Sequence, residues 1–99
     1  MPERQIRRAV AERFAANVRR LREQAGLNQG ELAFRADIHR TQISLIEGGR
    51  RVGRLDTVIK LAGALGVGVE ELAEGMSWEP AEWASGGFKV DGREDEAGG

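Results

Sequence analysis

The sequence predicts an all-α fold: a compact five-helix domain with a short C-terminal extension. Apolar residues recur every three or four positions, glycines and capping residues separate these runs, and no useful stretch alternates with period two. Of the 99 residues, 40% are apolar and 31% charged, as in globular proteins. We divide the chain into a basic N-terminal extension of the first helix (1–13), a helical domain (14–75) and an acidic tail with aromatic residues (76–99).

The first expected helix is long. Pro2 suits a helix start because its missing N–H would be unpaired there in any case. Gly26 then supplies a left-handed stop. Asn28, followed three residues later by Glu31, resembles a capping box, so a second helix is expected over 29–36. One apolar stripe runs along the first helix, formed by Ile6, Val10, Phe14, Val18, Leu21 and Ala25.

Three further helices are expected. Asp37 and Ile38 form a tight connection to the third, at 39–47, in which Ile43 and Ile46 face the core. The fourth helix ends at Gly66 and carries an apolar stripe of Leu55, Val58, Ile59, Ala62 and Leu65. The fifth is short, opening at Gly68 and ending at Gly75.

The tail has a different composition. Trp78, Trp83 and Phe88 are its apolar anchors, among Gly, Ser, Pro and acidic residues. Residues 86–90 would suit a short strand, but an alternation of two residues is too short to establish one. Since exposed tryptophans are costly, we expect the aromatic residues either to fold back on the domain or to bury in a partner. The sequence leaves both outcomes open.

Charge is segregated along the chain, and several classes of protein are excluded. Residues 1–60 carry a net charge of +6 and residues 61–99 a net charge of −7, and 13 of the 15 basic residues are arginine. This distribution indicates a basic face that binds a polyanion. Without cysteine and with one histidine, the chain offers no expected metal site and no cofactor site. We expect a cytoplasmic protein that is not an enzyme, with no membrane segment, because no apolar run or catalytic constellation stands out.

Two short helices joined by a tight turn have the spacing of a helix-turn-helix. Over 14–75 the sequence resembles the Cro/lambda-repressor-type regulators, also called the XRE family, and the resemblance implies a DNA-binding domain of that fold. The matching blocks are Val18-Arg19-Arg20-Leu21-Arg22, Gly26-Leu27-Asn28-Gln29, Glu31-Leu32-Ala33, Ile43-Ser44, Ile46-Glu47, Leu55-Asp56-Thr57 and Leu61-Ala62 with Ala64-Leu65-Gly66-Val67.

The resemblance implies roles for individual residues. Base reading falls on Arg40, Thr41 and Leu45, since arginine can fork onto guanine and the other two can contact a thymine methyl. Arg22 and Glu47 match a buried ion pair of the family, which is structural. Contacts to the DNA backbone fall on Asn28, Gln29, His39, Gln42, Arg50, Arg51 and Arg54. For Gln42, a contact within its own helix, back to His39, is the equal alternative.

The expected function is sequence-specific binding of double-stranded DNA as a transcriptional regulator, most simply a repressor. One such domain makes few base contacts, so a homodimer on a two-fold symmetric operator is expected. The segment after Gly66 and the aromatic residues Trp78, Trp83 and Phe88 are the candidate dimer or partner contacts. Two alternatives remain: an antitoxin that binds its toxin through the tail, and a protein-binding scaffold that does not read DNA.

Overall fold

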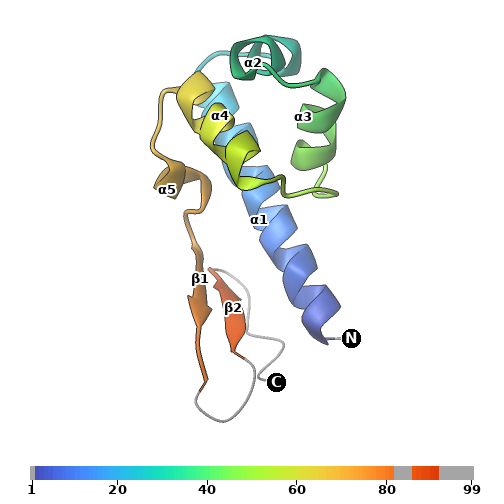
Figure 1. The fold of residues 1–99 in the computed structure, drawn as a ribbon, viewed down its shortest axis with the longest axis vertical. Helices are drawn as coiled ribbons and strands as arrows, with labels where there is room; N and C mark the ends of the chain where they lie inside the picture. Colours follow the sequence, from blue (N-terminus) through green and yellow to red (C-terminus); the bar gives the residue numbers. More distant parts are fainter. Residues whose placement is uncertain (1, 82–85, 92–99) are drawn as a thin grey trace.

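The computed structural model describes residues 2–81 and 86–91, with side chains described from Arg7 onward. Five helices follow one another in the expected places: α1 (Pro2–Gln24), α2 (Gln29–Ala36), α3 (Arg40–Glu47), α4 (Leu55–Leu65) and α5 (Val69–Leu72). Two strands follow, β1 (Met76–Glu79) and β2 (Gly87–Val90). In Figure 1, α2, α3 and α4 gather around the C-terminal half of α1, and the two strands lie beside its N-terminal half. The all-α class and the five helices are confirmed.

Helix α1 is the longest helix. It continues without a break through residue 13, where the sequence analysis divided the N-terminal extension from the helical domain. Its stripe of Phe14, Val18 and Leu21 is buried in the core, as predicted, whereas Ala25 at the end of that stripe is exposed. Gly26 has a φ of 73°, a left-handed conformation that glycine adopts without strain. The remaining core side chains come from α2, α3, α4, α5 and the turn after α1: Leu27, Leu32, Ala33, Ala36, Ile43, Ile46, Leu61, Ala62, Leu65 and Leu72.

Helix α4 corrects one expectation from the sequence. Its buried side is formed by Thr57, Leu61, Ala62 and Leu65. Leu55 and Ile59, which the sequence placed on the inward stripe, are 70% and 53% exposed. At about 100° per residue, these two positions lie one turn apart on a second apolar face of the helix, turned away from Leu61 and Leu65. The helix therefore presents apolar side chains to both the core and the solvent.

A buried asparagine fixes the end of α5 to α1. The side-chain amide nitrogen of Asn17, which is fully buried, donates to the carbonyl oxygens of Leu72 and Glu74 at 2.9 Å each. Its amide oxygen accepts from Arg20 at 3.2 Å. Both the nitrogen and the oxygen of the buried amide are therefore hydrogen-bonded, so burying it leaves no polar atom unsatisfied. Its two bonds to the backbone fix the direction in which the chain leaves α5.

The strands β1 and β2 pair antiparallel, which the sequence analysis left undecided for residues 86–90 and did not expect for residues 76–79. In the register, Met76 pairs with Val90 and Trp78 with Phe88. Side chains on a strand alternate between faces, so these four lie on one face of the hairpin. Trp78 and Phe88 meet edge to face, with ring centroids 5.0 Å apart, and remain 53% and 37% exposed.

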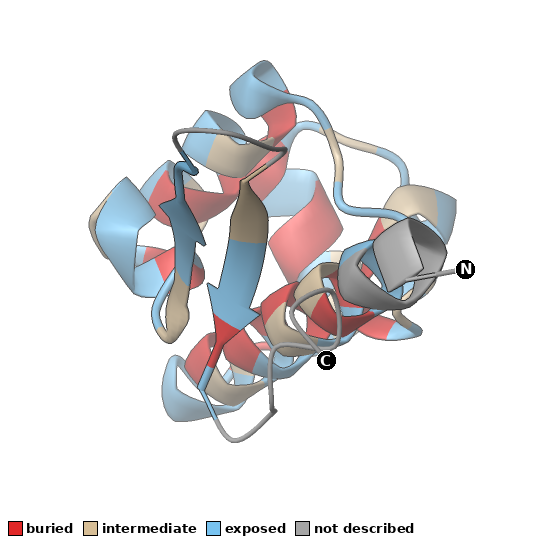
Figure 2. Ribbon diagram, turned by 90° about the horizontal axis from the view of Figure 1, so that it is seen from below, coloured by how far each residue is buried: buried red, intermediate tan, exposed pale blue. Residues whose placement is uncertain are grey.

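The base of this hairpin is attached to α1. Val90 is buried, and β2 packs on α1. The Arg13 guanidinium donates to the carbonyl oxygens of Glu74 at 3.2 Å and Asp91 at 3.4 Å, before β1 and after β2. In Figure 2 the strands are pale blue along most of their length and red only where β2 ends. Arg13 thus belongs to a structural contact.

Candidate nucleic-acid interface

The turn between α2 and α3 sets the angle of the two helices. Asp37 has a φ of 55°, a left-handed conformation that aspartate tolerates better than most residues. Its N–H donates to the carbonyl oxygen of Phe34, and the N–H of Ile38 donates to that of Ala33, so the end of α2 is capped within the turn. The Lys60 ammonium of α4 donates to the carbonyl oxygen of Asp37 at 3.5 Å and so links α4 to the turn.

Helix α3 divides cleanly into a core face and a solvent face. Ile43 and Ile46 are fully buried, which confirms their predicted inward direction. Since positions three residues apart share a helix face, the burial of these two fixes the rotation of α3 about its axis. Arg40 and Thr41 are exposed at its first turn, and Leu45 is half-buried one turn further on.

Ser44 was not among the predicted base readers. It is exposed and lies four residues after Arg40, so it occupies the same outer face of α3. Its spacing of four residues from Arg40 is the signal in the sequence that could have found it. Four side chains of α3 are therefore available to a ligand along its outer side: Arg40, Thr41, Ser44 and Leu45.

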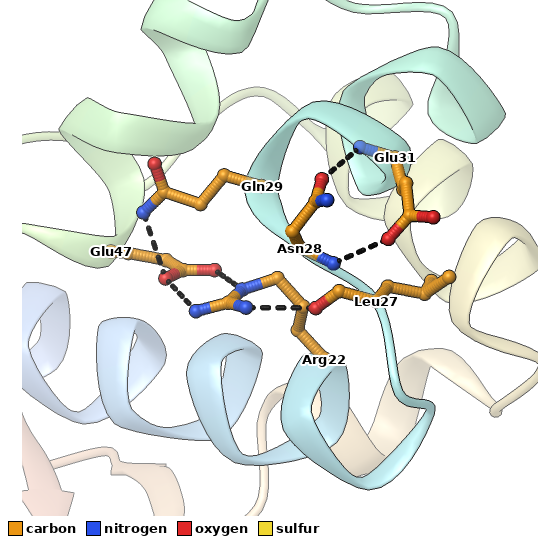
Figure 3. Close-up of polar contacts among 6 residues, drawn as sticks. All are labelled: Arg22, Leu27, Asn28, Gln29, Glu31 and Glu47. Carbon is orange, nitrogen blue, oxygen red and sulfur yellow. Dashed lines mark hydrogen bonds and ion pairs between the residues drawn. The ribbon is translucent and has the colours of Figure 1, made fainter.

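A buried ion pair joins α1 to the end of α3, beside the start of α2 (Figure 3). The Arg22 guanidinium donates to the two carboxylate oxygens of Glu47 at 2.6 and 3.0 Å and to the carbonyl oxygen of Leu27 at 2.8 Å. The side chains of Arg22 and Glu47 are only 14% and 5% exposed. The hydrogen bond with Glu47 raises the pKa of Arg22, with smaller contributions from the charges of Glu47 and Glu23, while burial opposes the rise.

The same carboxylate holds Gln29. The amide nitrogen of Gln29 donates to Glu47 at 3.1 Å, so one carboxylate fixes the first residue of α2 and the guanidinium of α1 together. The side-chain amide of Gln29 is half-buried and keeps one N–H free of Glu47. The predicted contact with a phosphate would use this N–H together with the backbone N–H groups at the start of α2.

Asn28 caps helix α2, as the sequence indicated. Its side-chain oxygen accepts from the N–H of Glu31 at 2.8 Å, and the Glu31 carboxylate accepts from the N–H of Asn28 at 2.9 Å. The capping oxygen is thus occupied, and only the amide N–H groups of Asn28 remain for a phosphate. Its predicted role at the DNA backbone depends on those donors.

Replacing Asn28 separates these two roles. In Asn28→Ala the cap is lost, and we expect the free energy of unfolding to fall by about 1 kcal/mol. In Asn28→Ser the hydroxyl still caps but the amide donors are gone, so we expect near-normal stability with weaker DNA binding. Urea denaturation and DNA titration measure the two effects. Equal DNA affinity in Asn28→Ser and the unmodified protein would limit Asn28 to capping.

The loop between α3 and α4 is basic and solvent-exposed. Arg50, Arg51 and Arg54 are all exposed, and Arg54 lies 3.9 Å from the Asp56 carboxylate in a loose surface pair. Gly49 and Gly53 have φ values of 74° and 96°, which let this short loop turn back toward α4. The three arginines therefore lie between the end of α3 and the start of α4 and are exposed to solvent.

His39 and Gln42 flank the first turn of α3. His39 is the N-cap residue of α3, exposed and without a side-chain capping bond. No capping bond joins the side chain of Gln42 to His39 at the start of α3 in the described part of the chain, and the predicted contact of Gln42 with the DNA backbone stays a prediction.

The aromatic residues of the tail are remote from α3. Figure 1 shows the hairpin and α3 on opposite sides of α1. Trp78 and Phe88 pack on each other rather than into the core, whereas Trp83 lies outside the described residues.

Within residues 2–81 and 86–91 there is no cluster of His, Asp or Glu that could hold a metal ion. No helix in the described part of the chain is both long and apolar enough to cross a bilayer.

An outward-facing second helix on a tight turn, followed by a basic loop, defines a helix-turn-helix protein, and the chain belongs to the helix-turn-helix domain family, which it matches over residues 13–75. It is thus related to DNA-binding transcription regulators rather than to enzymes. It is similar to control protein C.BamHI of Bacillus amyloliquefaciens, with 42% identity over 62 residues, which are 62% of this chain and 76% of that protein.

Two solved structures share this part of the fold. The restriction-modification controller protein C.AhdI from Aeromonas hydrophila is 35% identical, with a TM-score of 0.61, over 63% of this chain and 94% of that one. The hypothetical transcription factor NHTF from Neisseria is 34% identical, with a TM-score of 0.62, over 65% of this chain and 74% of that one. These comparisons confirm the resemblance to XRE-type regulators on which the site residues were chosen.

Proposed function

We propose that this regulator reads double-stranded DNA with α3 and represses transcription by occupying an operator. The observation that carries the proposal is the orientation of α3: Ile43 and Ile46 are buried, while Arg40 and Thr41 are exposed at its first turn. In a helix-turn-helix, the N-terminal residues of the second helix meet base edges in the major groove. Arginine there forks onto the O6 and N7 atoms of guanine, and threonine and leucine contact a thymine methyl.

Contacts to the DNA backbone would hold α3 in the groove. Arg50, Arg51 and Arg54 supply charge on one side of the helix. On the other side, the start of α2 offers backbone N–H groups that favour an anion. Each phosphate neutralised adds about 0.9 to the slope of log K against log salt concentration. Together these contacts fix the register in which α3 meets the bases.

Arg40→Ala tests the assignment of base reading. We expect binding to the preferred site to weaken by about 1–3 kcal/mol, with little change on random duplex, because a base contact is made only on the correct sequence. The preferred site would come from selection of bound duplexes from a random pool, and competition titrations would compare the two DNAs. Equal losses on both DNAs would show that Arg40 contacts a phosphate instead.

A homodimer on a two-fold symmetric operator fits the surface of α4. Leu55 and Ile59 are exposed one turn apart, and Gly63 continues the same line with no atom within 4 Å of where a Cβ would stand. A second copy could therefore bring its own helix close to this face and bury the apolar side chains of both. Half-sites about 34 Å apart would result if the two α3 helices enter successive major grooves.

The relatives suggest which genes are regulated. C.AhdI is named as a restriction-modification controller protein and C.BamHI as a control protein, and we propose a controller function of that kind for this chain, acting in the cytoplasm on its own operator. An in vitro transcription assay on a promoter that carries the selected site would test repression. Transcript levels that stay constant as the protein saturates the site would contradict it.

The exposed Trp78–Phe88 pair is the surface that the antitoxin and scaffold alternatives would use. An antitoxin would bind DNA and also a second protein through this pair, whereas a scaffold would show no salt-sensitive DNA binding. A DNA titration at several salt concentrations therefore separates the scaffold from the regulator that we propose.

A further inference from the structure

The first turns of α1 lie outside the part of the chain that the family matches, yet the fold holds them in a defined place. Residues 2–12 precede the matched range 13–75. Arg13 ties α1 to both ends of the hairpin, and Ala9, one turn before Arg13, is buried. The hairpin therefore braces one side of the α1 extension.

Another side of the extension approaches the basic loop. A Cβ placed on Gly49 would lie 3.5 Å from Cγ and 3.8 Å from Cα of Glu12, so the loop backbone and α1 are in contact there. Arg8 lies four residues before Glu12 and shares its helix face, with Cβ atoms about 5–6 Å apart. Arg8 is exposed. It thus stands one helical turn from the segment that continues into Arg50 and Arg51.

We propose that Arg8 is a further contact to the DNA backbone. It lies before the domain that the family shares and would add one or two phosphates to those contacted by the basic loop. The inference rests on the proposed function, since it requires α3 to lie in the major groove. One helical turn advances about 5.4 Å, and phosphates of one strand follow each other about every 3.4 Å of duplex axis. Because Arg8 is exposed one turn from the Glu12–Gly49 contact, its long side chain could reach a phosphate next to those that the loop would contact.

The local charges favour this partner. Arg8, Arg50 and Arg51 are all exposed, and the acidic Glu12, which lies against the loop at Gly49, already has an interaction within the chain. The guanidinium of arginine pairs with phosphate through two parallel N–H donors. A contact of this kind is independent of base sequence, so it adds affinity without changing which operator is preferred.

Arg8→Ala tests the inference in the full-length chain on the selected duplex and on random duplex. We expect several-fold weaker binding at 0.1 M salt on both DNAs, and a salt slope lower by about 0.9. Arg8→Lys should keep the slope, because it keeps the charge. Ethylation interference should lose one or two phosphates at the edge of the footprint in Arg8→Ala and retain them in Arg8→Lys.

Lys89→Ala is the matched control. It also removes one positive charge, but Lys89 lies on the hairpin, 2.7 Å from Glu79 and across α1 from α3. Equal slopes and footprints for Arg8→Ala and Lys89→Ala would overturn the inference while leaving the proposed function intact. Failure of the unmodified protein to bind any duplex in a salt-sensitive way would instead overturn the proposed function, and the inference with it.

Discussion

Glu47→Ala should destabilise the protein by about 3–5 kcal/mol, although the residue lies on α3, the helix that we propose reads DNA. The substitution leaves the Arg22 guanidinium buried without its counter-ion and leaves the amide nitrogen of Gln29 without its acceptor. Removing one member of a buried pair costs far more than the pair contributes, because the remaining charge keeps its desolvation cost. In a domain of this size, each 1 kcal/mol lowers the melting temperature by about 4–8 °C.

A second ion pair provides the control for this prediction. Lys89 and Glu79 are 2.7 Å apart, close to the 2.6 Å of Arg22 and Glu47, but their side chains are more than half exposed. We expect Glu79→Ala to change the free energy of unfolding by no more than about 1 kcal/mol. Replacing Arg22 and Glu47 together with apolar residues should recover part of the loss. Equal effects of Glu47→Ala and Glu79→Ala in urea denaturation would show that burial is not what makes the inner pair important.

Ile59→Asp should convert the proposed dimer into monomers and weaken operator binding by about 10²–10⁴-fold. In a dimer, binding of one half-site makes binding of the second intramolecular, and monomers lose that gain. Ile59 is the central apolar residue of the line formed with Leu55 and Gly63, so a carboxylate there would be buried unpaired in any dimer that uses this face. Analytical ultracentrifugation measures the mass, and titration with the two-fold symmetric site measures the affinity.

Phe34→Asp is the matched control, because it introduces the same charge at a residue of α2 that is 88% exposed. We expect this variant to keep the oligomeric state of the unmodified protein. If Ile59→Asp remained dimeric while Trp78→Asp became monomeric, the dimer contact would lie on the hairpin, which carries Trp78 and Phe88, two of the candidate contacts from the sequence. That result would show that the exposed apolar face of α4 is not the dimer contact.

The local signals of the sequence predicted the helices and the orientation of α3 well. The pairing of Asn28 with Glu31 marks the start of α2, and the spacing of Ile43 and Ile46 sets which side of α3 meets the core. Both depend on residues within one or two helical turns of each other. The pair of Arg22 and Glu47 came from the family resemblance instead, because nothing local relates side chains 25 residues apart.

The features that the sequence predicted less well depend on contacts between distant segments. Leu55 and Ile59 have the spacing of a core stripe with Leu65, and only the packing of α4 on α2 and α5 shows that Leu61 is buried with Leu65 while Leu55 and Ile59 are exposed. The hairpin has strands of four residues, too short for a periodic signal. Its position is set by the burial of Val90 and by Arg13, which is 61 residues from Glu74.

The bridge from Arg13 to Asp91 has a kinetic consequence. It joins residues 78 apart, whereas the capping and turn contacts around α2 and α3 join residues only a few positions apart. Closing so long a loop costs more chain entropy than forming neighbouring helices, so such contacts tend to form late in folding. During synthesis the ribosome must release residue 91 before the first helix gains its brace. The helices around α3, which we propose bind DNA, can thus assemble before the hairpin packs against the N-terminal turns of α1.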